Sequence, residues 1–200
     1  MLAAIALAAA LPTISITVHA SPDVSPRLIK WVVDEADDIW RGAGVRIAWT
    51  LESRDGTVPA TRSLEDPLRV VIDHERGTRL GGEVALGWVV FEGDRPRPEI
   101  HLSYANAVAG VERIAPRAML NMLARMRVDE LVATALGRAL AHELGHYLLE
   151  LKNHSEDDAL MHASWTAEEL FGAEPPRLRL NAAERRALAS KLSPALLTKR

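Results

Sequence analysis

Along the first hundred residues, apolar positions recur either every second residue, as in strands, or every three to four residues, as in helices. Ile14, Ile16 and Val18 alternate with other positions, which is typical of a strand with one buried face. From Ser25 to Gly42 the apolar positions recur every three to four residues, and Ser25 followed by proline is a typical helix start. Alternating or compact apolar runs then predict four further strands, at residues 45–52, 68–75, 83–93 and 98–104.

The second half of the chain has helical periodicity. The longest helical pattern spans residues 129–150, and a further helix at 116–126 precedes it or merges with it. Residues 166–171 suit a short helix, and Asn181 with Glu184 forms a capping-box pattern at the start of a last one. The turn-rich residues 93–98 make the last two strands antiparallel neighbours. Mixed strands and helices predict an α+β domain of α/β type.

Composition limits what the domain can do. The 200 residues carry a formal charge of −3, are 48% apolar and include no cysteine. One domain of ordinary globular composition follows, with no reason to expect a nucleic-acid partner. Disulfides and thiolate metal sites are excluded, so a metal would be held by histidine and carboxylate side chains.

The first twelve residues are apolar and end at a proline. We read residues 1–12 as a truncated or atypical signal segment and 13–200 as the functional domain, which predicts a secreted or periplasmic protein. Pro12 interrupts an apolar run that is already too short to span a bilayer, so we expect no stable membrane insertion.

The strongest chemical signal is the run His142-Glu143-Leu144-Gly145-His146. Residues four apart on a helix lie one turn along the same face, so both imidazoles can reach one ion. Glu143 lies 100° round from His142, where it can approach a water molecule on the metal without replacing it. The pattern therefore predicts a Zn²⁺ site with His142 and His146 as ligands and Glu143 as general base.

Catalytic zinc usually takes three protein ligands, and the spacing leaves the third open. His154 lies past the expected helix end, where a chain reversal would return it to the metal. Glu168 and Glu169 are alternatives, because a second helix can supply a glutamate. The acidic pair at 157–158 is a further possibility, although it reads more simply as a solvated turn.

The segments HELGH and HSEDDALM resemble the metzincin superfamily of zinc metallopeptidases, and especially its matrixin-like members. The resemblance implies a twisted mixed five-stranded sheet with an antiparallel edge strand, two main helices and a small C-terminal helical part. It also implies His154 as the third ligand, Met161 as the methionine of the turn beneath the zinc, and Trp165 as a wall of the specificity pocket.

The chain departs from that pattern at the exit of the helix. His154 follows His146 by eight residues rather than six, and no glycine lies between them. We therefore expect the helix to continue to Leu151, with Lys152 and Asn153 making the turn. The tyrosine that some metzincins place after the methionine is also missing, so a zinc-binding domain without catalytic activity is an alternative.

Taken together, the sequence predicts a zinc-dependent metalloendopeptidase in which Glu143 activates a zinc-bound water to hydrolyse a peptide or protein substrate. Gly87 would let the edge strand accept an extended peptide, or it marks a bulge. His74 and His101 lie in or beside other strands and are expected not to bind this metal. The sequence gives no indication of the oligomeric state.

Overall fold

The computed structural model describes residues 13–52, 66–77, 84–114, 125–155, 159–163, 165–172 and 178–192. Five strands form one sheet in the order β2-β1-β3-β5-β4. Their bounds are β1 Thr13–Ala20, β2 Arg46–Glu52, β3 Arg69–Asp73, β4 Gly87–Glu92 and β5 Arg95–Ser103. The first four in that order run parallel, and β4 pairs with β5 antiparallel at the edge. The predicted mixed five-stranded sheet with an antiparallel edge strand is confirmed.

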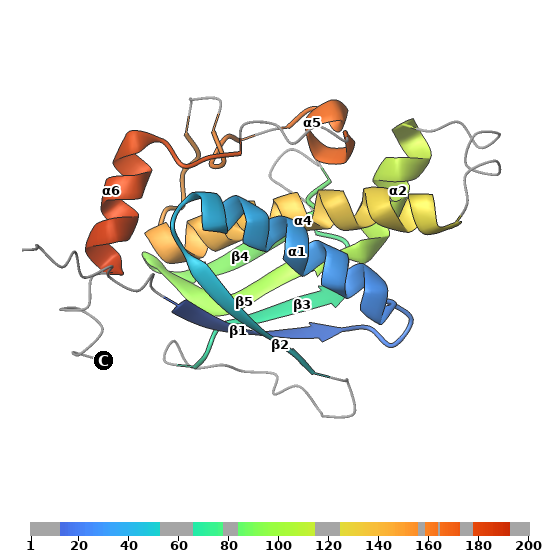
Figure 1. Cartoon of the computed structure of the whole chain (residues 1–200), viewed down its shortest axis with the longest axis horizontal. Coiled ribbons are helices and arrows are strands. Elements are labelled where there is room, and N and C mark those ends of the chain that lie inside the picture. The colour runs from blue at the N-terminus through green and yellow to red at the C-terminus, as the bar shows by residue number, and fades with distance from the viewer. Residues whose placement is uncertain are drawn as a thin grey trace, which may run out of the picture.

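Two long helices, α1 (Pro26–Gly42) and α4 (Arg125–Leu149), lie side by side over one face of this sheet (Figure 1). The sheet presents Ile16, Val18, Ile72, Ile100 and Leu102 to them, all at most 2% exposed. Because alternate strand residues point to opposite faces, these residues belong to one apolar face of the sheet. The core therefore lies between the sheet and the helix pair, as an α+β domain requires.

The two helices are fixed to each other at named contacts. Trp40 is fully buried and its indole N–H donates to the Ala141 carbonyl at 3.1 Å. A methyl group at Gly137 would lie 2.5 Å from Glu35 Cβ and 2.8 Å from the Val32 carbonyl oxygen, so the backbones approach where only glycine fits. These contacts fix the position of α4 relative to α1, and with it the α4 turn that carries His142 and His146.

The local start signals act as predicted. Ser25 Oγ accepts a hydrogen bond from Leu28 N at 3.2 Å, which caps α1. Capping boxes also open α5 (Ala167–Phe171) and α6 (Ala182–Lys191). The β4–β5 connection is shorter than expected, because β5 already begins at Arg95 and Gly93 makes the turn with a φ of 58°.

One helix was not predicted. α2 (Tyr104–Ile114) begins directly where β5 ends, so no loop separates the two elements. The Ser103 side chain accepts a hydrogen bond from Asn106 N at 3.2 Å and marks the helix start. The predicted helix at 116–126 and the signal segment at 1–12 lie largely or wholly outside the described residues, and export stays a prediction.

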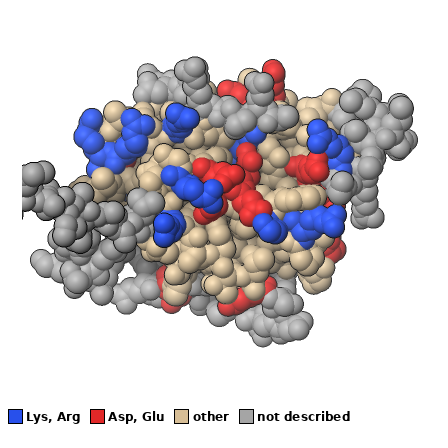
Figure 2. Space-filling model, in the orientation of Figure 1, with Lys and Arg blue, Asp and Glu red and all other residues tan. Residues whose placement is uncertain are grey.

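Charges of both signs are interleaved over the helix-covered face. Figure 2 shows acidic side chains in its middle with basic side chains around them. On α1, Lys30 pairs with Asp34 at 2.5 Å, and Arg41 pairs with both Asp37 and Asp38. Within the described parts of the chain, no helix has the length and apolarity needed to cross a membrane.

Candidate metal centre

Three histidines meet at the C-terminal part of α4. His142 and His146 lie one turn apart on α4 and are 4% and 7% exposed, and His154 arrives from the segment that follows the helix. His146 Nε2 lies 3.1 Å from His142 Nε2 and 3.3 Å from His154 Nε2. One ring nitrogen of each histidine therefore points to a common position, although His154 is eight residues beyond His146.

Backbone carbonyl groups fix the orientation of two of these rings. His142 Nδ1 lies 2.7 Å from the Leu160 carbonyl oxygen, and His146 Nδ1 lies 2.5 Å from that of Leu151. A carbonyl oxygen only accepts, so each Nδ1 carries a proton and donates it. In the neutral ring the Nε2 atom then presents a lone pair toward the other histidines.

This arrangement fits a zinc ion. Lone pairs on neighbouring Nε2 atoms repel one another unless a cation lies between them. Two nitrogens that bind one tetrahedral ion at about 2.0–2.1 Å are about 3.3–3.4 Å apart. The observed separations of 3.1 and 3.3 Å are close to this value, and imidazole nitrogens with an outer hydrogen bond at Nδ1 are typical zinc donors.

The exit from α4 differs from the expectation. The helix ends at Leu149 rather than Leu151, and the residue in the left-handed conformation is Glu150, with a φ of 54°, rather than Asn153. Leu151 N donates to the His146 carbonyl at 3.2 Å, which is the long-range bond of a Schellman motif with Glu150 in the position that glycine usually takes. The chain thus reverses early enough to bring His154 back.

Met161 is buried against α4 at Gly145. It is 1% exposed, and a methyl group at Gly145 would overlap its sulfur atom. The Met161 carbonyl accepts a hydrogen bond from Ser155 N at 2.7 Å, next to His154. Gly145 therefore lets Met161 pack against the helix backbone between the two α4 histidines.

A cavity of about 140 Å³ opens beside His142 and Glu143. Its lining comes from the segment that leads into β4, from α4 and from the residues after Met161: Val84, Ala85, Leu86, Gly87, Ala139, His142, Glu143, His162, Ala163, Trp165 and Leu170. Trp165, which the resemblance implies as a wall of the specificity pocket, belongs to this lining. Its ring meets that of His142 edge-on, with the ring centroids 5.4 Å apart. Cavity and histidine group form one continuous site.

Glu143 and Gly87 lie next to each other in this site. Glu143 is 5% exposed, and a methyl group at Gly87 would lie 2.9 Å from Glu143 Cγ and 3.0 Å from Leu102 Cδ2. The absence of a side chain at Gly87 therefore leaves room for the carboxylate under the edge strand. His162 also lines the cavity. The sequence had drawn attention to this region only because it lacks the tyrosine that some metzincins place after the methionine.

The alternative third ligands are placed differently. The Glu169 carboxylate accepts a hydrogen bond from Thr166 N at 2.7 Å in the capping box of α5, which lowers the pKa of Glu169. Within the described residues, the group of ligand atoms around His142 and His146 is completed by His154 and does not include Glu168 or Glu169. The acidic pair at 157–158 lies outside the described residues.

A second polar cluster lies on the sheet face away from α1 and α4. His101 stacks on Trp88 with ring centroids 5.1 Å apart, and its Nε2 lies 3.0 Å from Glu99 Oε1. Asp73 and Glu75 each place one carboxylate oxygen within 4.8 Å of a His101 ring nitrogen. Burial lowers the pKa of His101, and the negative charges of Asp73 and Glu75 oppose that shift.

The pKa of His101 predicts a pH dependence of stability. Because the pKa lies below 6.5 in the folded protein, the unfolded chain binds the proton first as the pH falls. Stability contributed by neutral His101 is therefore present above pH 6.5 and is lost as the pH falls from there through the folded pKa. We expect the unfolding free energy, measured with denaturant from about pH 8 to about pH 5, to fall less steeply in His101→Gln. Identical slopes in both proteins would contradict this.

No protein-family model matches the chain, and no curated protein matches it in sequence. Solved structures do match. Archaemetzincin (amzA) from Methanopyrus kandleri is 16% identical with a TM-score of 0.54, over 90% of this chain and 96% of that one. Metalloproteinase-II from Bacteroides fragilis is 14% identical with a TM-score of 0.48, over 90% of this chain and 53% of that one.

At these identities the likeness to archaemetzincin concerns the fold. The chain has a metzincin-like fold, and it contains a triad of histidines placed so that it could bind a metal ion.

Proposed function

We propose that the protein is a zinc-dependent metalloendopeptidase. The observation that carries the proposal is the convergence of three Nε2 atoms, at 3.1 and 3.3 Å, beside a buried glutamate in a cavity under an edge strand. The metzincin-like fold supports it, since the fold neighbour with a TM-score of 0.54 is named archaemetzincin. His142, His146 and His154 would hold the ion.

Zinc held by three histidines acts as a Lewis acid that polarises a carbonyl group and makes water more acidic. The residues of the chain supply the other parts of hydrolysis. A Glu143 carboxylate oxygen accepts a proton from the attacking water and returns it to the amine nitrogen that leaves. The burial of Glu143 keeps this carboxylate away from bulk solvent.

The edge strand and the cavity give the substrate its place. β4 is bonded to β5 on one side and is an edge strand of the sheet, so an extended peptide can add to its other side through backbone hydrogen bonds. Gly87, which has no side chain, leaves room for Glu143 next to this strand. The cavity of about 140 Å³, with Val84, Leu86 and Leu170 in its lining, accepts one apolar substrate side chain.

His162 gives the site a further polar group. Among the cavity-lining side chains, His142 and Glu143 have roles in holding zinc and moving the proton, and His162 is the remaining imidazole. An imidazole N–H is a hydrogen-bond donor for a substrate carbonyl oxygen as negative charge develops on it. His162 would take the role that a tyrosine has in some of the metzincins that the sequence resembles.

Metal removal tests the proposal. We expect the purified chain to bind one Zn²⁺ per molecule and to cleave some members of a broad peptide library. Dialysis against a chelator should abolish cleavage, and stoichiometric Zn²⁺ should restore it, because the Lewis acid that activates the water is lost with the metal. Full zinc occupancy without any cleavage would support the alternative of a non-catalytic zinc-binding domain. Absence of zinc binding would overturn both.

A further inference from the structure

The turn that ends α4 uses an unfavourable residue. Among the described residues other than glycine, Glu150 is the one with a positive φ, 54°. A side chain disfavours this conformation because its Cβ comes too close to the following carbonyl oxygen, and glycine is therefore the usual residue at this position. The turn must be held by contacts elsewhere in the chain.

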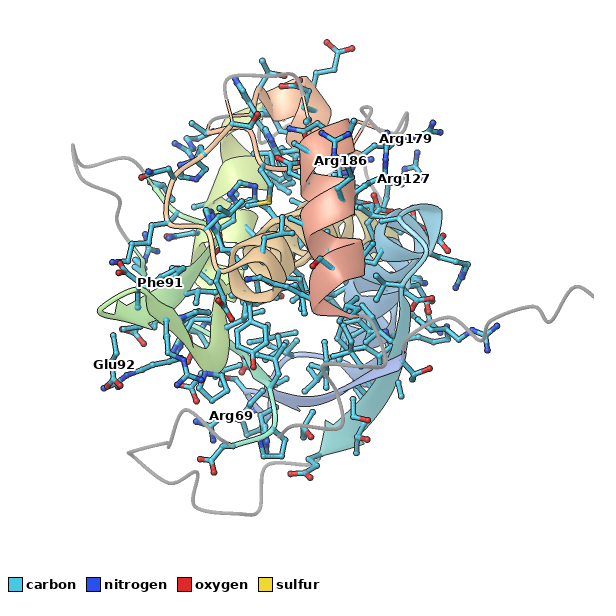
Figure 3. All side chains as sticks on the ribbon, turned by 90° about the vertical axis from the view of Figure 1, so that its left-hand side faces the viewer. Arg69, Phe91, Glu92, Arg127, Arg179 and Arg186 are labelled. Atoms are coloured by element: carbon cyan, nitrogen blue, oxygen red, sulfur yellow. The ribbon has the colours of Figure 1, made fainter. Side chains whose placement is uncertain are left out.

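Lys191 makes those contacts from α6. Its Nζ donates to the Leu149 carbonyl oxygen at 2.9 Å and lies 3.0 Å from Glu150 Oε2. The last carbonyl groups of a helix lack partners within the helix, and a cation at this end is favourable. Figure 3 views this side of the molecule and shows α6 standing across the end of α4. One side chain thus binds both the last α4 residue and the left-handed one.

α6 is anchored independently of this contact. Its Asn181–Glu184 capping box closes the first turn, and Leu188 is 3% exposed in the core. Lys191 is the last residue of the helix. Removing its ammonium group therefore leaves the capping box and the buried residues of α6 in place.

The turn controls two of the three histidines. Leu151, the residue after Glu150, donates its N–H to the His146 carbonyl and accepts the Nδ1–H of the His146 ring. Three residues further on, His154 completes the group. If Glu150 left the left-handed conformation, both Leu151 hydrogen bonds would break and the path to His154 would change.

We infer that Lys191 is a positioning residue for the metal centre, which acts by holding Glu150 in the left-handed conformation. This inference rests on the proposed function. It means that Lys191 on α6 increases the affinity of the three histidines for Zn²⁺. The ligand is a divalent metal ion at the site already described, and the new element is its dependence on a side chain 37 residues beyond His154 in the sequence.

Two measurements on Lys191→Met test the inference. The first is amide hydrogen exchange of Leu151 in the metal-free chain, which does not depend on zinc. The second is Zn²⁺ affinity by chelator competition. We expect Leu151 exchange and the Zn²⁺ dissociation constant each to rise about two- to fivefold, the upper part of the range for a surface ion pair, here the one between Lys191 and Glu150. The amide of Arg185, bonded to the Asn181 carbonyl, reports whether α6 stays folded.

Glu150→Gly provides the decisive background. Glycine takes the left-handed conformation without strain, so the Lys191→Met effect on both quantities should fall below about twofold there. Lys30→Met, which removes an exposed lysine paired with Asp34 on α1, is the matched control and should change neither quantity.

The outcomes separate this inference from the proposed function. Equal losses in the wild-type and Glu150→Gly backgrounds, or unchanged Leu151 exchange in Lys191→Met, would overturn the role of Lys191 even if the chain binds zinc. Faster Leu151 exchange that Glu150→Gly corrects would support the turn mechanism even if the chain failed to bind zinc, and in that case the proposed function would fail alone.

Discussion

Replacing Glu143 by glutamine is expected to lower the rate of peptide hydrolysis by about 10²–10⁴-fold, the usual contribution of a general acid–base group. Glutamine has nearly the same size and keeps one acceptor oxygen, but it does not accept and return a proton. Because the residue is 5% exposed, bulk solvent does not readily replace it in this role. The measurement is kcat/KM on a peptide selected from the library, with zinc content determined in the same preparation.

Glu130→Gln is the matched control for this variant. Glu130 lies on the same helix and pairs with Arg127 at the protein surface, away from the histidines. Its substitution should leave the rate within about twofold of the wild type, as expected of a surface ion pair. If Glu143→Gln retained zinc and cleaved the peptide at a rate close to normal, Glu143 would not be the base.

Replacing His154 by alanine is expected to weaken Zn²⁺ binding by at least about 100-fold, which exceeds the loss of about 10–100-fold typical of an outer hydrogen-bond partner. His154 supplies one of the three Nε2 atoms, and two histidines alone leave the ion with an incomplete ligand set. Competition with a chromogenic chelator measures the change. Buried His142 and His146 still have their carbonyl partners in the variant, so the fold of α4 should be kept.

Two other variants decide between the possible third ligands. Glu169→Gln should keep the wild-type affinity, because that carboxylate caps α5. His74→Ala, which removes a half-exposed histidine paired with Asp23, should also have no effect on zinc. The opposite pattern, with zinc retained in His154→Ala and lost in Glu169→Gln, would assign the third ligand to α5.

The sequence predicted the parts of this molecule that local patterns determine. The strands and α1 follow from periodicity and from Ser25, and the positions of His142, Glu143 and His146 follow from helix geometry. α2 escaped prediction because it follows β5 directly, so no turn or loop residues separate the helix from the strand. The pattern of Ser103 followed by Asn106 was the available signal for its start.

The left-handed residue at the end of α4 was predicted wrongly for a different reason. Local preference points to asparagine for a left-handed residue in the absence of glycine, and Asn153 was the natural choice. The structure uses Glu150, and the contact that accompanies it comes from Lys191, 41 residues later. The contact between Gly87 and Glu143 likewise joins residues that are far apart in the sequence. A pattern confined to neighbouring residues contains no information about such contacts.

Main-chain atoms fix the orientation of two rings in the histidine triad. The rings of His142 and His146 are directed by the carbonyl groups of Leu160 and Leu151. Every amino acid carries that carbonyl group, so an alanine scan would score position 151, where the leucine is 39% exposed, as dispensable. Its backbone nevertheless makes two hydrogen bonds to His146. Substitutions that restrict the backbone there, such as proline, would reveal a dependence that side-chain truncation hides.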